Sequence, residues 1–198
     1  QFRQILLSRT YDNTSDFVFH NLLQHFGRRE PNSVVLLITL SHDWSNYSVA
    51  SAKCGFNLRR LENGGNVLVI DIMRKFLQDT QSGQDEDYCN FIQDRFKQFI
   101  DGRSEDAMKK PIIVMFDDLR ILTSIGYDPS KIFKLVTSIA KKLRDQSAHL
   151  AKNQSNHLIV QTSSDLNGSL CNLQNMSDIY LILRPLETGH STRVDGTI

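Results

Sequence analysis

The chain has 198 residues, a length that suits one domain with a full hydrophobic core, and we expect a single domain over residues 1–198. Apolar residues make up 40% and charged residues 23%, as in soluble globular proteins, and the net charge of +1 creates no overall field that attracts nucleic acid. No stretch reaches the ~20 apolar residues that cross a membrane, so we expect no membrane partner.

Short apolar runs alternate with segments of helical period along the whole chain, which is typical of a mainly parallel sheet covered by helices. The runs lack strict polar alternation, as expected of strands that are buried on both faces. In chain order, the predicted strands are Gln4–Ser8, Val34–Leu40, Val67–Ile72, Ile112–Phe116, Leu158–Gln161 and Ile179–Leu183. We therefore predict an α/β fold.

Caps and apolar spacing predict four helices between these strands. They are Asp16–Phe26, Trp44–Cys54, Tyr88–Ile100 and Ser130–Leu150. The first should end at Gly27, because glycine often terminates helices. The polar stretch Gln78–Asp87 is predicted to be a surface loop, and Asn63–Asn66 a turn.

The strand Ile112–Phe116 ends in Asp117-Asp118, the pattern of a buried strand that delivers a carboxylate to a Mg-nucleotide. A working site also needs a glycine-rich phosphate loop that ends in Lys-Ser or Lys-Thr. Its place is after the first strand, where residues 8–16 read Ser-Arg-Thr-Tyr-Asp-Asn-Thr-Ser-Asp, with no glycine and no lysine. We therefore expect the fold of a nucleotide hydrolase whose hydrolytic site has been lost, with no bound cofactor or metal.

Five positions mark this degenerate nucleotide site, and none is expected to be catalytic: Ser8, Arg9, Asp16, Asp117 and Asp118. Arg9 is the one cation of the segment, and Asp16 would repel phosphate at the helix start. The first interpretation of Asp117-Asp118 is a metal-holding pair. The second is a pair that caps the turn and binds a neighbouring side chain.

Three other groups of residues in the sequence bear on possible chemistry. Asp71, at the end of the third strand, is a further candidate carboxylate. Ser41-His42-Asp43 contains the residue types of a hydrolytic triad, but adjacent residues cannot form the relay. The cysteines, Cys54, Cys89 and Cys171, form no C-x-x-C motif and suggest reduced thiols in the cytoplasm or nucleus.

The segment from Lys131 to Lys152 is locally basic, since six of its residues are Lys or Arg and one, Asp145, is acidic. Such a face could contact phosphates, and the candidate RNA contacts are Lys141, Lys142 and Arg144. The alternative is an ordinary solvated helix face. The Ser-, Asn- and Gly-rich segment Thr162–Ser177 has the composition of a flexible contact loop.

Three segments together resemble the Elongator complex protein six family, one of the RecA-like subunit families of the Elongator accessory subcomplex. Leu40–Leu58 resembles its second strand, Tyr-Ser helix start and Lys-x-Gly turn, although Asn46 stands where a second histidine often occurs. Pro111–Gly126 resembles its carboxylate-ended strand and Leu-Leu-Ser-Leu-Gly continuation, and Leu183–Gly196 resembles its Leu-x-Thr-Gly hairpin. The resemblance runs from about Ile5 to Ile198.

The resemblance implies a RecA-like fold and a non-catalytic subunit. Family members join subunits four and five in a hetero-hexameric ring that binds the catalytic Elongator core and tRNA and supports wobble-uridine modification. Two alternatives stay open, namely the sister family of subunit five and an atypical P-loop ATPase. Because the chain starts at Gln1 without Met and stops in a turn-like segment, we also expect that both ends were trimmed.

Overall fold

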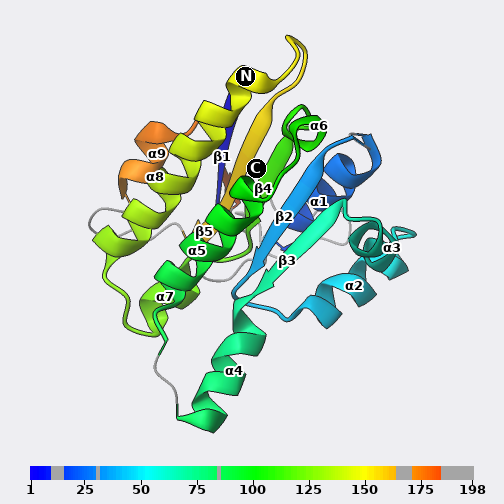
Figure 1. Ribbon diagram of the computed structural model, residues 1–198. Helices are drawn as coiled ribbons and strands as arrows, with labels where there is room; N and C mark the ends of the chain where they lie inside the picture. The colour runs from blue at the N-terminus through cyan, green and yellow to red at the C-terminus, as the bar shows by residue number, and fades with distance from the viewer. Residues whose placement is uncertain (10–15, 30–31, 84–85, 164–170, 184–198) are drawn as a thin grey trace, which may run out of the picture.

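The computed structural model describes residues 1–9, 16–29, 32–83, 86–163 and 171–183 and has a central six-stranded sheet (Figure 1). The strand order is β3-β2-β4-β5-β1-β6, and every pairing is parallel, which confirms the predicted parallel α/β sheet. The strands are β1 (Phe2–Arg9), β2 (Val34–Thr39), β3 (Val67–Asp71), β4 (Ile112–Phe116), β5 (Asn156–Ser163) and β6 (Ile179–Leu183).

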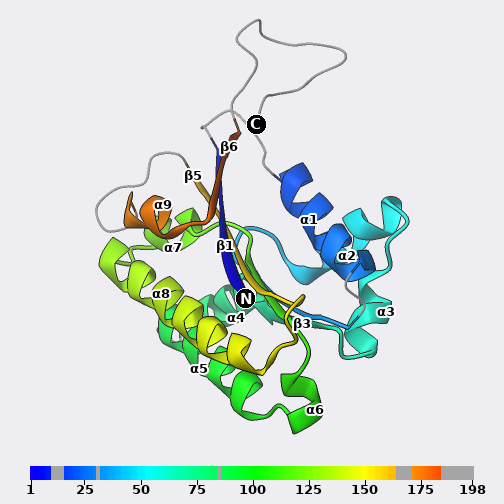
Figure 2. The same cartoon turned by 90° about the horizontal axis from the view of Figure 1, so that it is seen from above.

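Helices cover both faces of the sheet (Figure 2). One face carries α1 (Asp16–Arg29), α2 (Trp44–Lys53) and α3 (Leu58–Asn63). The other carries α4 (Ile72–Ser82), α5 (Tyr88–Asp101), α8 (Pro129–Gln146) and α9 (Asn172–Met176). Shorter elements are α6 (Glu105–Met108), α7 (Arg120–Ser124) and the 3-10 turn η1 (Ser147–His149). Within the described ranges, no helix is long and apolar enough to cross a membrane.

The sheet separates two hydrophobic cores because successive side chains of a strand point to opposite faces. In β4 all five residues are fully buried. Ile113 and Met115 join the core under α1, α2 and α3, whereas Val114 and Phe116 join the core under α5 and α8. Burial on both faces explains why β2 and β4 read as unbroken apolar runs.

Strand β1 lies between β5 and β6, and its register pairs Phe2 with Asn156 and Ile5 with Ile179. Asn156 is buried, and its side chain joins three elements. Its oxygen accepts a hydrogen bond from the Ile112 amide at 2.8 Å, and its nitrogen donates to the Leu143 carbonyl at 2.8 Å. This side chain thus fixes the start of β4 and the end of α8 against β5.

The prediction that the first helix ends at Gly27 is wrong, because α1 continues to Arg29. A Cβ atom on Gly27 would lie 2.3 Å from the Phe56 ring and 3.3 Å from a Leu61 methyl group. Glycine stands there to allow close packing of α1 against Phe56, not to end the helix.

The predicted surface loop Gln78–Asp87 is wrong over its first half, because α4 continues to Ser82 and ends at Gly83 in a left-handed conformation. Asp71 caps the start of α4, so the third strand ends there and Ile72 belongs to the helix. Asp87 likewise caps α5.

The predicted helix Ser130–Leu150 corresponds to α8 followed by η1. The prediction of a contact loop over Thr162–Ser177 is also wrong in part, because β5 continues to Ser163 and α9 occupies Asn172–Met176. Residues 164–170, and the hairpin region 184–198 used in the family resemblance, lie outside the described residues.

Candidate functional site

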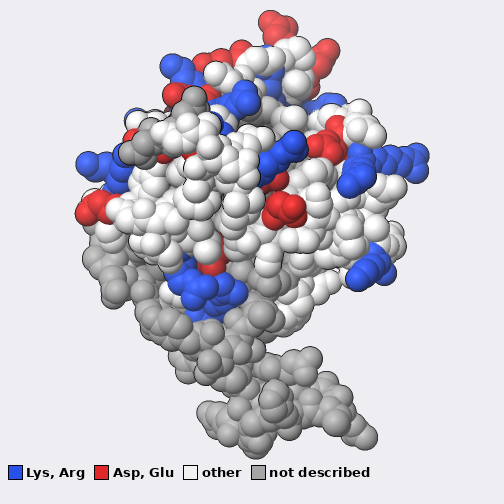
Figure 3. Space-filling view, turned by 90° about the horizontal axis from the view of Figure 1, so that it is seen from below, with Lys and Arg blue, Asp and Glu red and all other residues white. Residues whose placement is uncertain are grey.

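The candidate site lies at the carboxyl end of the central strands. Because the sheet is parallel, the ends of β1, β4 and β5 meet at one edge, where ligands of open α/β sheets usually bind. β5 separates β1 from β4. Seen from this end, Lys, Arg, Asp and Glu side chains are scattered around a largely uncharged surface (Figure 3).

Asp117 is fully buried directly after β4 and accepts hydrogen bonds from the segment that follows β2. Its Oδ1 accepts from the Leu40 amide at 2.7 Å. Its Oδ2 accepts from the Ser41 amide and hydroxyl, each at 3.0 Å, and from the His42 amide at 3.4 Å. The Tyr47 hydroxyl of α2 donates to the same oxygen at 3.0 Å.

These contacts make Asp117 the centre of a polar cluster that joins β4, the β2–α2 segment and α2. Burial raises the pKa of the Asp117 carboxyl, and the hydrogen bonds from Leu40, Ser41 and Tyr47 oppose that rise. Five donated hydrogen bonds compensate for the loss of water around a buried carboxylate. The cluster therefore has the properties of a structural tie, meaning a buried group that holds the end of β4, the segment after β2 and helix α2 together.

Asp118 is also fully buried, and it forms an ion pair with Arg9 at the end of β1. The Arg9 Nη2 to Asp118 Oδ2 distance is 2.6 Å. The Arg120 guanidinium lies 3.6 Å from the same oxygen, and the Arg120 amide donates to Asp118 Oδ1 at 3.0 Å. Asp118 thus caps the turn after β4 and pairs with a neighbour, the arrangement that the second interpretation of the acidic pair describes.

The other predicted positions of the nucleotide site are only partly described. Ser8 is buried in β1 beside Arg9. Asp16 is the first residue of α1, and its side chain lies outside the described residues, as do residues 10–15. The structure thus brings Arg9, Asp117 and Asp118 to one edge of the sheet.

The remaining polar candidates near this edge act as helix caps. Asp71 accepts from the Arg74 amide at 2.9 Å and from the Trp44 amide at 3.0 Å. Asp43 accepts from the Asn46 amide at 2.9 Å and caps α2. Ser41 and Asp43 therefore serve different partners, since the Ser41 hydroxyl donates to Asp117 and the Asp43 carboxylate accepts from the Asn46 amide.

The basic helix is separate from this edge. Arg144 stacks over the Phe2 ring at 5.2 Å, at the start of β1 and hence at the opposite end of the sheet from Asp117. Lys141 and Arg144 are exposed, and Lys142 is half-buried. Lys131, counted in the basic segment, forms an ion pair with Asp87, which reduces the free positive charge of α8.

The described part of the chain contains no cluster of three or more His, Cys, Asp or Glu residues that could hold a metal ion. Burial lowers the pKa of His157 to about 4, with Arg3 adding to the effect, and the ring lies 5.1 Å from Phe26. Its role is packing. Cys89 is buried, and burial raises its thiol pKa to about 11, whereas Cys54 and Cys171 are exposed.

Sequence reasoning missed Tyr47 and Arg120 as partners of the acidic pair. Arg120 carried a usable signal, because a basic residue two positions after a buried aspartate can reach back over the turn. Tyr47 carried none, since its contact with Asp117 depends on β2 lying next to β4.

Solved structures with this arrangement of strands and helices cover nearly the whole chain. A KaiC-like protein from the archaeon Pyrococcus horikoshii has a TM-score of 0.64 and 12% identity, over 96% of this chain and 74% of that one. An uncharacterised protein from the same organism, solved with an unknown peptide, has a TM-score of 0.64 and 9% identity, over 95% of this chain and 80% of that one.

The chain has a RecA-like fold. At these identities the similarity concerns the fold alone. No family model matches the sequence, and the comparison with curated proteins found no match.

Proposed function

We propose that this chain is a non-catalytic subunit of the hetero-hexameric RecA-like ring of Elongator. In that ring it would assemble with subunits four and five, contact the catalytic Elongator core, and support tRNA binding for wobble-uridine modification. The RecA-like fold is compatible with this proposal. The assignment to Elongator rests on the three sequence segments Leu40–Leu58, Pro111–Gly126 and Leu183–Gly196.

The non-catalytic part of the proposal is carried by one observation, which is that both carboxylates after β4 already have partners within the chain. Asp117 accepts from Leu40, Ser41, His42 and Tyr47. Asp118 is paired with Arg9, the one cation of the segment where a phosphate loop would lie. A Mg-nucleotide would compete with these contacts, and residues 8–16 supply neither glycine nor lysine to hold its phosphates.

Native mass spectrometry of the chain co-expressed with subunits four and five tests the assembly. We expect a six-membered ring that contains two copies of this chain. A chain that stays monomeric in the presence of both subunits contradicts the proposal. A ring that contains subunit four, and in which this chain takes the place of subunit five, would instead identify the chain with the sister family.

An atypical P-loop ATPase is the second candidate, favoured by the position of Asp117 and Asp118 at the ligand-binding edge of the sheet. It predicts saturable binding of Mg-ATP to the isolated chain in calorimetry, weakened by Arg9→Gln and unchanged by the control Lys97→Gln on α5. The non-catalytic proposal predicts no binding at millimolar ATP.

A stand-alone RNA-binding module that uses α8 is the third candidate. The double variant Lys141→Glu, Lys142→Glu should then weaken RNA binding by the isolated chain and flatten its salt dependence. Lys109→Glu with Lys110→Glu is a matched control, because that pair is exposed at the end of α6. RNA binding that occurs only in the assembled ring supports the Elongator proposal.

A further inference from the structure

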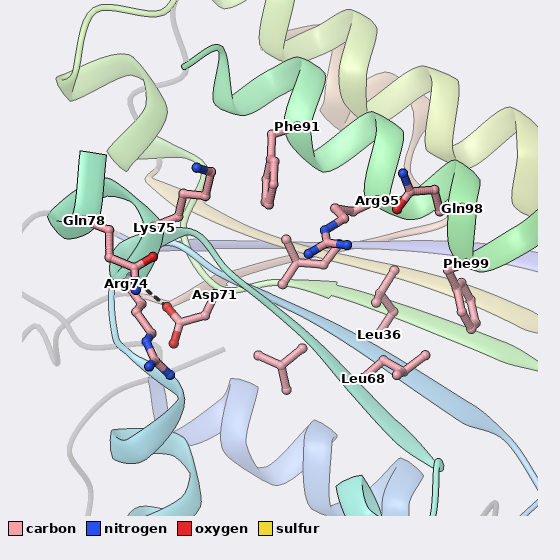
Figure 4. Close-up of a pocket in the computed structure, with 12 residues that line it drawn as sticks. Leu36, Leu68, Asp71, Arg74, Lys75, Gln78, Phe91, Arg95, Gln98 and Phe99 are labelled. Atoms are coloured by element: carbon pink, nitrogen blue, oxygen red, sulfur yellow. Dashed lines mark hydrogen bonds between the residues drawn. The ribbon is translucent and has the colours of Figure 1, made fainter. Parts of the chain in front are cut away.

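A groove of about 550 Å³ runs beside the edge strand β3, between β3 and α5 (Figure 4). Leu68 forms its floor at the sheet edge, and Phe91 and Phe99 of α5 face it from the other side. Arg95 extends from α5 over the strands, and Arg74 and Lys75 of α4 lie at one end. The groove is separate from the cluster around Asp117 and uses none of its residues.

Strand β3 forms the open edge of the sheet, since it pairs with β2 and with no second strand among the described residues. The Val35 amide donates to the Asn66 carbonyl, which directs the backbone groups of residue 66 toward β2. Backbone direction alternates along a strand, so Val67 and Val69 direct their N–H and C=O groups away from β2. These groups are placed to receive another strand.

This edge lacks the features that usually prevent strand addition. Val67–Ile70 contains no proline, no charge and no bulge in its regular register with β2. Leu68 points into the groove and is 38% exposed, although it is a large apolar residue. An added strand would cover Leu68 and satisfy the outward backbone groups.

The charges around the groove define what such a strand should carry. Lys75 forms ion pairs with Asp79 and Glu86, and the Asp71 carboxylate caps the start of α4. Arg74 and Arg95 are exposed and form no ion pair with any described acidic residue. Arg95 is held over the Phe91 ring at 5.4 Å. The groove is therefore apolar along β3 and positively charged above it.

We propose that this groove binds an extended segment of another protein as an added strand along β3, with an apolar and an acidic side chain two positions apart. Side chains two positions apart point to the same face of a sheet, so the apolar one would cover Leu68 beside Phe99 while the acidic one pairs with Arg95 or Arg74. A second copy of this chain is a poor occupant, because two β3 edges would bring like charges together. The proposal does not depend on the assignment to Elongator.

The first experiment is a selection from a displayed library of random dodecapeptides against the intact chain. We expect enriched peptides that carry an apolar and an acidic residue two positions apart, and binding about tenfold weaker to Arg95→Glu than to the wild type. Lys97→Glu is the matched control, because Lys97 is exposed on α5 outside the groove, and it should change binding less than twofold.

The apolar wall is tested with Leu68→Lys, which places a charge on the strand edge. Leu77→Lys is its control, because Leu77 is 53% exposed on α4 and does not line the groove. Only the first change should abolish binding, and circular dichroism verifies that both variants are folded. Equal effects of the two changes would overturn the proposed location.

Strand pairing itself is tested by N-methylation of the best peptide at alternate residues. Each methyl group on an amide that faces β3 should weaken binding by about 2- to 10-fold, the value of one hydrogen bond, and the other set should be neutral. Equal sensitivity of both sets would overturn strand addition. A library that yields no binder sensitive to Arg95→Glu, or a single-stranded RNA that competes for the groove at similar affinity, would overturn the peptide proposal.

Discussion

Replacing Asp117 with asparagine tests whether its carboxylate is a structural tie. Oδ1 accepts one hydrogen bond, from the Leu40 amide, and Oδ2 accepts the other four. An asparagine retains most of these bonds by keeping its oxygen at the Oδ2 position. Its NH2 group then faces the Leu40 amide, and two buried donors lie against each other.

An unsatisfied buried donor costs ~1–3 kcal/mol, and the bonds that remain change from charged to neutral, which weakens them. Loss of the buried charge removes part of its desolvation cost and offsets some of this change. The free energy of unfolding should therefore fall by about 2–4 kcal/mol. Urea denaturation followed by circular dichroism at pH 7 measures it, since the slope shows whether unfolding stays two-state.

Asp106→Asn is the control, because the Asp106 side chain is 92% exposed and, among the described residues, forms an ion pair with Lys109 alone. It should change stability by less than ~0.5 kcal/mol. A stability of Asp117→Asn that equals or exceeds that of the wild type would refute the structural role. It would mean that the carboxylate is held at the expense of stability, as functional groups often are.

Three further variants test other parts of the fold. Gly27→Ala should lower stability by about 1–3 kcal/mol in urea denaturation, because its Cβ would clash with the Phe56 ring. Asn156→Ala leaves the buried Ile112 amide without an acceptor and should cost about 2–3 kcal/mol. His157 has a folded pKa of about 4, below its unfolded value of ~6.5, so the unfolded state binds the proton more strongly. Its contribution to stability is complete above pH 6.5 and is lost as the pH falls toward 4, and His157→Gln should flatten the unfolding free energy measured across that range.

The strands were predictable because each contains a continuous apolar run. All six were located, with β1 and β5 somewhat longer than predicted, since Asn156 and Ser163 belong to β5 although they are polar. Helix α4 was missed because its second half is polar and its buried position 79 is an aspartate, paired with Lys75 and with the Tyr88 hydroxyl. The first half of α4 does have apolar residues at helical spacing, Ile72, Met73, Phe76 and Leu77, a signal too short to predict the whole helix.

The candidate site was predictable only in part. The sequence alone shows that a carboxylate follows a buried strand, and that residues 8–16 contain no glycine and no lysine. The donors to Asp117 come from a segment after β2, and the partner of Asp118 comes from β1. These contacts follow from the order of strands in the sheet, which periodicity does not encode.

The position of β1 between β5 and β6 has a consequence for how the chain folds during synthesis. β1 is made before β2, β3 and β4, whereas its partners Asn156–Ser163 and Ile179–Leu183 are made after them. Strands β2, β3 and β4 can pair earlier, but the apolar run Ile5–Leu7 must wait until β5 has left the ribosome. Such distant pairing slows folding and leaves a strand exposed to wrong partners. Pairing of β1 with β5 and β6 should be a late step in forming this sheet, and nascent chains should depend on chaperones until β6 emerges.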